Sequence, residues 1–395
     1  MNLKYICFII NILLAVATIR GAAQPTQASQ ISILTMEAGS DIYELEGHAA
    51  LRVVDSHIGD ICIDWGVFDF DSPNFVYRFT AGQTDYTLAC HPTQLLIHRA
   101  NLRGRRVVEN VLDLDSTTIT RVIELVSENI KPWNRQYRYN YVKDNCSTRV
   151  YQIIEKAVGD TITVTELPDY MPQKPTFRKL MTYFHRNYPW YQFGIDLALG
   201  SGIDRELNNR ETLYAPMIME IQLPAATING KKLVKETRTL VYGRPGGLTA
   251  GPTPFYATPL FVAIIILLVS IAITIRDIKT KKPSRWFDTV LYTLFGVMGL
   301  VLTFLIFVSV HEATSPNWLY LWLNPLCFIG ATLIWLKSCK KVVFYWHATN
   351  FVLLITLIII DFIGIQYLNI SFYPLIVADM SRSIAYIYQN VNQSK

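Results

Sequence analysis

The sequence predicts a mixed α+β soluble domain followed by an all-α transmembrane domain. Charged residues make up 17% of the 395 residues, whereas about 25% is usual for soluble proteins. Long apolar runs dominate the chain after Thr253, while residues 25–250 show strand-like alternation and helix-like spacing. We therefore expect one soluble domain of about 220 residues and one membrane domain of about 140, both ordinary sizes.

The N-terminus has the pattern of a secretory signal peptide. Residues 6–19 form an apolar core, and Arg20-Gly21-Ala22-Ala23 offers small residues for cleavage. An uncleaved signal anchor is the alternative. We place the signal peptide at 1–23, the periplasmic domain at 24–242, a linker rich in glycine and proline at 243–256, and the transmembrane domain at 257–395.

Four apolar runs approach or exceed the roughly 20 residues that cross a bilayer. They are Pro259 to Ile275, Thr289 to Val310, Leu319 to Leu336 and Val342 to Ile365. A weaker run, Tyr367 to Tyr388, contains Asp379 and Arg382, and is either a fifth span or an interfacial helix. Basic residues follow the first and third runs, whereas the loop 311–318 has no lysine or arginine. The positive-inside rule places this loop and the soluble domain outside a bacterial inner membrane.

Short segments of the soluble domain predict a sheet with at least one helix. The predicted strands are Ile31 to Leu34, His48 to Asp55 and Asp60 to Val67, and Ser116 to Asn129 is a predicted helix. Asn229-Gly230 predicts a hairpin turn. It would join Ile221 to Ile228, which Pro224 limits to an edge strand, to Lys231 to Tyr242.

The clearest predicted helix begins at Cys146. Its apolar residues recur at helical spacing from Val150 to Val158, Gly159 ends it, and Asp144 or Asn145 is a suitable N-cap. Cys146 would then lie at the positive end of the helix dipole, which favours the nucleophilic thiolate. A lone cysteine is otherwise a small buried apolar residue. The polar neighbours of Cys146 favour the catalytic interpretation.

A cysteine nucleophile needs a neighbouring base, and His48, preceded by Gly47, is the candidate. His57 and His91 are more typical of surface histidines. Asp64 is the candidate third group that orients the imidazole, although simple alternation places it opposite Leu51, so that a bulge would be required. Further carboxylates and amides remain alternatives for this role, namely Asp55, Asp60 and Asn140.

Four residues are predicted to bind substrate. Arg52 shares a strand face with His48, Asn145 and Arg149 flank the cysteine, and His311 lies in the outer loop, which is otherwise a plain interfacial loop. Zinc spacing and phosphate-binding glycine motifs are missing from the sequence, so we expect no metal, no cofactor and no nucleic-acid partner. A Cys62–Cys90 disulfide is compatible with an oxidising compartment and would leave Cys146 free.

The order of a histidine, a polar strand residue and Asn-Cys at a helix start resembles the circularly permuted papain-like hydrolases. A closer resemblance is to the Lnb family of Bacteroidota, and it spans nearly the whole mature chain. The segments that carry it are Gly47-His48-Ala49-Ala50-Leu51-Arg52, Asp64-Trp65-Gly66-Val67-Phe68-Asp69-Phe70, Asp144-Asn145-Cys146-Ser147-Thr148-Arg149, Phe193-Gly194-Ile195-Asp196-Leu197, Asn317-Trp318 and Trp322-Leu323-Asn324-Pro325-Leu326.

The resemblance implies a membrane-bound lipoprotein N-acyltransferase with a permuted papain-like periplasmic domain. Such an enzyme would take an acyl chain from a membrane phospholipid donor, hold it on Cys146 as a thioester, and pass it to the N-terminal amine of a diacylated lipoprotein acceptor. The alternatives are a permuted cell-wall peptidase or amidase with the same Cys–His pair, and a non-catalytic, membrane-tethered binding protein.

Overall fold

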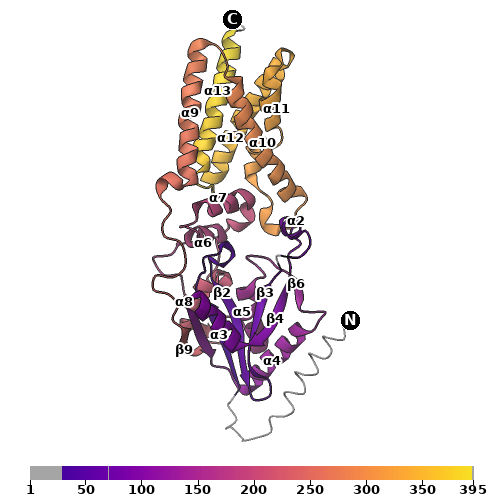
Figure 1. Cartoon of the computed structure of the whole chain (residues 1–395), viewed down its shortest axis with the longest axis vertical. Helices are drawn as coiled ribbons and strands as arrows, with labels where there is room; N and C mark the ends of the chain where they lie inside the picture. Colours follow the sequence, from indigo (N-terminus) through magenta and orange to yellow (C-terminus); the bar gives the residue numbers. More distant parts are fainter. Residues whose placement is uncertain (1–28, 70, 394–395) are drawn as a thin grey trace.

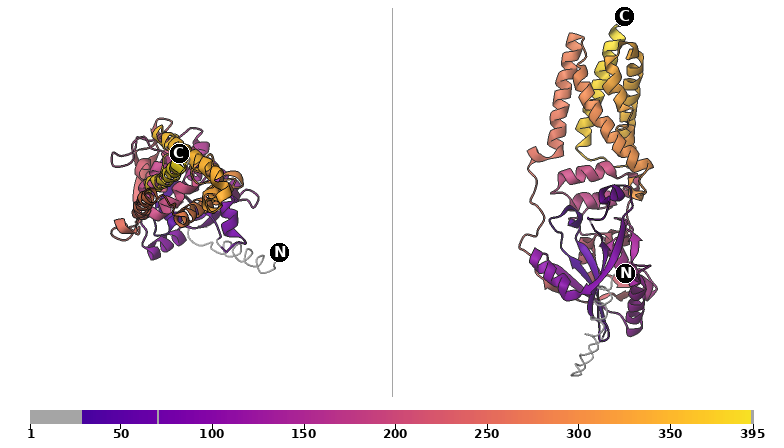
Figure 2. Two further views of the ribbon diagram at one scale, coloured as in Figure 1. Left: turned by 90° about the horizontal axis from the view of Figure 1, so that it is seen from above. Right: turned by 45° about the vertical axis from the view of Figure 1, so that its right-hand side comes forward.

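The computed structural model describes residues 29–69 and 71–393, so the predicted signal peptide lies outside the described residues. A β-rich domain at one end is followed by a bundle of long helices at the other (Figure 1). Helices α6 (Phe177–Phe184) and α7 (Pro189–Ala198) lie between the two parts in both side views (Figures 1 and 2). The predicted α+β domain followed by an all-α domain is confirmed.

The soluble domain is built on a seven-stranded antiparallel sheet. Its strand order is β6-β4-β3-β2-β1-β5-β9. The strands are β1 (Gln30–Met36), β2 (His48–Asp55), β3 (Gly59–Val67), β4 (Asp85–Pro92), β5 (Val107–Leu112), β6 (Gln136–Arg138) and β9 (Val234–Val241). The first three contain the strands predicted from alternation, and β2 and β3 form the predicted hairpin.

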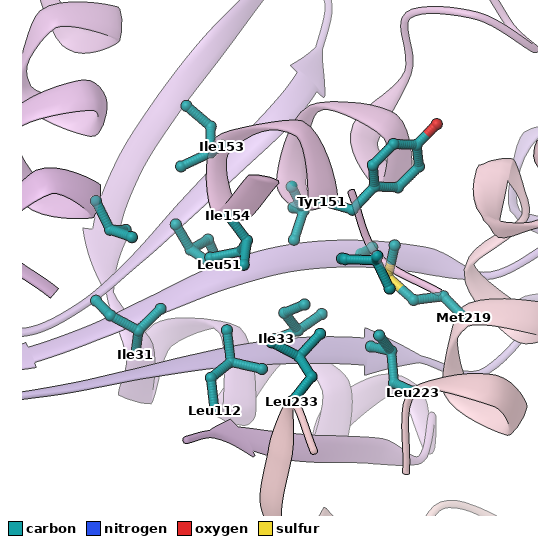
Figure 3. Packing of buried hydrophobic residues seen from close by; sticks show 14 of the residues in the cluster. Ile31, Ile33, Leu51, Leu112, Tyr151, Ile153, Ile154, Met219, Leu223 and Leu233 are labelled. Atoms are coloured by element: carbon teal, nitrogen blue, oxygen red, sulfur yellow. The ribbon is translucent and has the colours of Figure 1, made fainter. Parts of the chain in front are cut away.

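Helices cover both faces of this sheet. Helices α4 (Ser116–Ile130) and α5 (Cys146–Val158) pack on one face, where Leu51 meets Ile153 and Ile154 (Figure 3). On the other face, α3 (Thr93–Arg103) packs on residues that alternate with the first set, such as Ala50 and Cys62. Because apolar cores lie on both sides, central strands are apolar on both faces, and every residue of β5 is buried.

The predicted strand Ile221 to Ile228 is wrong over most of its length. Helix α8 (Pro216–Gln222) and a 3-10 turn (Leu223–Ala225) occupy it, and Pro224 fits that turn because it has no N–H to donate. The Asn229-Gly230 turn is confirmed, since both residues have positive φ as a type I′ turn requires. It joins only the short strands β7 (Thr227–Ile228) and β8 (Lys231–Lys232).

In the described part of the membrane domain, 3 helices are long and apolar enough to cross a membrane. They are α9 (Pro259–Thr280), α10 (Arg285–Phe307) and α12 (Lys340–Phe362). The apolar run Leu319 to Leu336 is not one continuous helix. It contains α11 (Cys327–Thr332) between 3-10 turns, and Pro325 precedes α11. Gly299 lets this segment approach α10, because a Cβ there would lie 2.4 Å from the Asn324 backbone.

The weak fifth run forms α13 (Phe372–Gln393), which packs inside the bundle rather than across its surface. Ser270 Oγ of α9 donates to the Ala378 carbonyl oxygen at 3.0 Å. The buried Arg382 pairs with Asp277 of α9 and Asp288 of α10. The charge of Arg382 on α13 therefore faces carboxylates of neighbouring helices and not lipid. A helix with this polar residue can lie inside the bundle although its hydropathy is low. The count of four or five membrane helices stays a prediction.

Residues 308–318, which include the predicted outer loop 311–318, contact the soluble domain. Val310 N donates to the Ala81 carbonyl oxygen at 3.0 Å, and Ser201 N donates to the Pro316 carbonyl oxygen at 2.8 Å. A Cβ on Gly200 would lie 2.1 Å from the Pro316 carbonyl oxygen, so only glycine permits this approach. The basic loop between α9 and α10 lies at the opposite end of the bundle (Figure 1).

Candidate active site

Cys146 is the first residue of α5, and Asn145 is its N-cap. The Asn145 side chain accepts from Thr148 N at 2.9 Å, and the Thr148 hydroxyl accepts from Asn145 N at 2.7 Å. This reciprocal capping box fixes the first turn of the helix. Cys146 is buried, with 7% of its surface exposed, so its thiol does not project into solvent.

The second role of Asn145 is to attach this helix start to the rest of the domain. Its Nδ2 donates to the carbonyl oxygens of Tyr141 at 2.7 Å and Tyr214 at 3.0 Å. Because both ends of the buried amide are occupied, the structure gives Asn145 a positioning role rather than a free group for substrate.

His48 is the first residue of β2, and its Nε2 donates a hydrogen bond to Asp64 Oδ1 of β3. Simple alternation predicted that a bulge between β2 and β3 would be needed, and this prediction is wrong because their paired residues show no shift in register. The register pairs Leu51 with Ile63, one residue away from the expected Leu51–Asp64 pair. A shift of one residue moves every side chain to the other face, so Asp64 shares the face of His48.

The electrostatics favour a protonated imidazole beside a carboxylate. Burial alone would lower the pKa of His48, but the charge of Asp64, and next that of Cys146, raise it well above its usual value. Burial would raise the pKa of Asp64, yet the neighbouring His48, followed by His91, holds it below its usual value. With Nε2 bonded to Asp64, Nδ1 is the ring nitrogen left for the Cys146 thiol.

His91, which was expected at the surface, also lies beside Asp64. Its Nε2 lies 3.7 Å from Asp64 Oδ2, and its side chain is only 14% exposed, which corrects the expectation of a surface histidine. The hydrogen bond to Asp64 raises the pKa of His91. Strand β4 pairs His91 with Cys62 of β3, and this register brings the His91 side chain beside Asp64. The local sequence around Cys90 does not indicate this register.

Three other candidate residues have partners within the protein. The guanidinium of Arg52 binds Asp60 and the buried Glu109. Arg149 pairs with Asp144 at the start of α5. His311 Nε2 bonds the Phe79 carbonyl oxygen at 2.7 Å, so it joins the outer loop to the soluble domain. The structure therefore brings Cys146, His48 and Asp64 together, with Arg149 alongside, and leaves Arg52 out.

Glu46, which precedes Gly47 and His48 in the chain, is a buried acid. Glu46 accepts a hydrogen bond from the Tyr214 hydroxyl at 3.3 Å and lies 3.8 Å from His185 Nε2. Burial raises the pKa of Glu46 to about 8, against the opposing hydrogen bonds from Tyr214 and Tyr141. In the sequence, Glu46 is marked only by its position directly before Gly47 and His48.

Neither a metal cluster nor a disulfide occurs among the residues that the structure describes. Cys62 and Cys90 are free thiols. The register pairs Cys90 with Ile63, so Cys62 and Cys90 point to opposite faces of the sheet. The arrangement of a thiol, an imidazole and a carboxylate suits nucleophilic catalysis by cysteine.

Comparisons with known proteins agree with this organisation. Residues 18–182 match the family model described as the Lnb N-terminal periplasmic domain, and residues 252–394 match the Lnb transmembrane domain. Neither a curated protein nor a solved structure matches the chain. The two matches cover the cysteine, the histidine, the carboxylate and the helical bundle. The chain is therefore a membrane protein with a periplasmic domain, and it belongs to the Lnb family.

Proposed function

We propose that this protein transfers an acyl chain from a membrane phospholipid, through a thioester on Cys146, to the N-terminal amine of diacylated lipoproteins in the inner membrane. The observation that supports this most is the position of the Cys146–His48–Asp64 group next to the membrane domain. Lys143, three residues before Cys146, binds Glu312 of the outer loop, with Nζ 2.6 Å from Oε2. Substrates anchored in lipid would reach a thiol at this place without leaving the membrane.

In the first half-reaction, Cys146 Sγ attacks an ester carbonyl carbon of the phospholipid. The S–C bond forms, the ester C–O bond breaks, and the proton held by His48 passes to the oxygen of the departing lysophospholipid. The N–H groups of Cys146 and Ser147 precede the capped Thr148 at the helix start. They are positioned to stabilise the oxyanion of the tetrahedral intermediate.

In the second half-reaction, the neutral amine of the lipoprotein attacks the thioester. The N–C bond forms, the S–C bond breaks, and His48 takes the proton that the amine loses. The thiolate–imidazolium pair is then restored. Asp64 stabilises the imidazolium and holds the ring in position in both halves.

Complementation of a strain that lacks this protein tests the proposal. Mass spectrometry of lipoprotein N-termini compares wild type, Cys146→Ser and a matched Cys339→Ser variant, whose cysteine lies in the membrane domain. We expect an added acyl chain with wild type and Cys339→Ser only. Identical N-termini in all strains would contradict the proposal and make cell-wall fragments the next substrates to test. Restoration of acylation by Cys146→Ser would favour a non-catalytic binding role.

A further inference from the structure

A cavity of about 510 Å³ opens beside α2 (Phe75–Thr80), outside the group formed by Cys146, His48 and Asp64. Aromatic rings and charged side chains share its wall. The aromatic residues are Phe68, Phe75, Phe79, Tyr86 and Tyr137, and the charged residues are Asp69, Arg78, Asp85 and Arg138. A wall that is both aromatic and charged suits an amphipathic ligand.

The cavity lies beside the end of the membrane helix α10. Tyr77 of α2 contacts Phe304 near the end of α10, with ring centroids 6.1 Å apart. Val76 is 76% exposed and Tyr77 is 58% exposed on this short helix. Aromatic and apolar side chains exposed beside the end of a membrane helix are typical of the lipid–water interface. A cavity at this place would face the lipid headgroups of a membrane crossed by α10.

One residue of the cavity wall, Tyr137, lies close to the start of the helix that carries Cys146. Tyr137, a lining residue, lies under the Arg149 guanidinium at 4.1 Å from the ring centroid, and Arg149 is one helical turn after Cys146. The Tyr137 hydroxyl is buried and has no hydrogen-bond partner in the described part of the chain. A buried hydroxyl without a partner is costly, so a ligand oxygen that reaches it would gain a hydrogen bond.

The charges on the cavity wall are balanced but incompletely paired. Asp85 is shared by Arg138, at 2.9 Å, and Arg78, at 3.5 Å, so both guanidinium groups keep donors for another anion. Asp69 receives a hydrogen bond from Asp71 N at 2.9 Å and keeps its second oxygen. Two cations and two anions complement a zwitterionic headgroup better than one with a net negative charge.

We propose that this cavity binds the headgroup of the donor phospholipid, and that the donor carries a primary ammonium group on its phosphate. The inference rests on the proposed acyl transfer. Arg78 and Arg138 bind the phosphate, and Asp69 binds the ammonium group. The glycerol esters then extend past Tyr137 toward Cys146, while the acyl chains lie against α2 and α10.

The test uses the full-length protein in bilayers of defined composition, with a diacylated lipopeptide as acceptor. The donor is either phosphatidylethanolamine or phosphatidylglycerol, which has no ammonium group, and the readout is acylated lipopeptide. We expect Asp69→Asn to lower kcat/KM with phosphatidylethanolamine about 10-fold, the size of one charged hydrogen bond, and to leave the slower reaction with phosphatidylglycerol unchanged. Asp71→Asn is the matched control, because Asp71 is an exposed neighbour outside the cavity wall.

Equal use of the two lipids by wild type, or an Asp69→Asn variant that behaves as wild type with both, would overturn the inference while acyl transfer stands. No transfer from either lipid would instead overturn the proposed function and the inference with it. Because Asp69 is exposed, we expect Asp69→Asn to leave folding unaffected. Equal thermal unfolding midpoints of the variants and the wild type check this expectation.

Discussion

His48 and Asp64 form a hydrogen bond between adjacent strands because both lie on one face of the sheet. The carboxylate is therefore held by β3 itself and not by a flexible loop. Gly66, with φ +88°, follows in the irregular stretch between Asp64 and Val67, where β3 changes its register with β4. The imidazole is therefore oriented by a residue of a central strand of the sheet.

Asp64→Asn should lower the pKa of His48, because the charge of Asp64 is a main cause of its elevation. The imidazolium is present below the folded-state pKa and is lost as the pH rises through it. The alkaline limb of kcat/KM for acyl transfer should therefore move to lower pH, with a loss of about 100-fold or more at its maximum. Asp55→Asn, at the other end of β2, is the control. An unchanged pH profile for Asp64→Asn would assign the third role to another residue.

Asn145→Ala should impair both stability and activity. It removes the cap of α5 and two hydrogen bonds that tie the helix start to Tyr141 and Tyr214. We expect a loss of about 1–3 kcal/mol in unfolding free energy. Asp115→Ala removes the corresponding cap of α4, away from the thiol, and should preserve activity. If both variants lose activity equally at a temperature where both are folded, Asn145 has no special role in positioning Cys146.

Glu46→Gln should make the protein less sensitive to alkaline pH. Between the ordinary pKa of 4.5 and the folded-state pKa of about 8, only the folded state keeps the proton. Stability of the wild type should therefore fall as the pH rises through this window, and the neutral glutamine should remove that loss. Thermal unfolding at pH 5 and pH 8.5 measures the difference. A midpoint for Glu46→Gln that falls as steeply as that of the wild type would contradict the assignment, and exposed Glu124→Gln serves as control.

Arg178→Ala should destabilise the junction between the two domains. The buried Arg178 donates to Asp204 at 2.7 Å and to Asp196 at 2.9 Å, and Asp196 accepts from Asn369 of the membrane domain at 2.8 Å. Removing the cation leaves two buried carboxylates unpaired, at a cost of about 3–5 kcal/mol. Arg205→Ala breaks a largely exposed pair with Glu211 and should cost about 0–1 kcal/mol. Unfolding midpoints in detergent distinguish the two, and equal midpoints would contradict the role of Arg178.

The parts of the site that sequence predicted best depend on local chemistry. The N-cap, the apolar spacing and Gly159 define α5 without reference to other elements, so Cys146 was placed correctly at its start. The face on which Asp64 lies depends on the register between β2 and β3. The hairpin turn and the apolar cores on both faces of the sheet set this register together, and the register predicted from alternation was wrong by one residue. His91 is brought in by β4, which the sequence did not predict as a strand.

In the fold as well, local features were predicted correctly and features that depend on distant contacts were not. The hairpin turn at Asn229-Gly230 follows from residues that tolerate positive φ. By contrast, the end of α8 and the 3-10 turn that follows it occupy residues 221–225, where a strand was expected, and Leu223 packs in the sheet core. The contact of α2 with the outer loop joins residues more than 200 positions apart, such as Phe79 and His311. Local patterns carry no information on such contacts.

The most direct measurement is the mass of Cys146 in the purified full-length protein after incubation with phospholipid in the absence of an acceptor. The account predicts an acyl adduct on the peptide that contains Cys146, released by hydroxylamine as a thioester and discharged by a diacylated lipopeptide. The adduct should be missing in Cys146→Ser and should form more slowly in Asp64→Asn. An adduct on another residue, or acyl transfer to the lipopeptide with Cys146 unmodified throughout, would contradict the account.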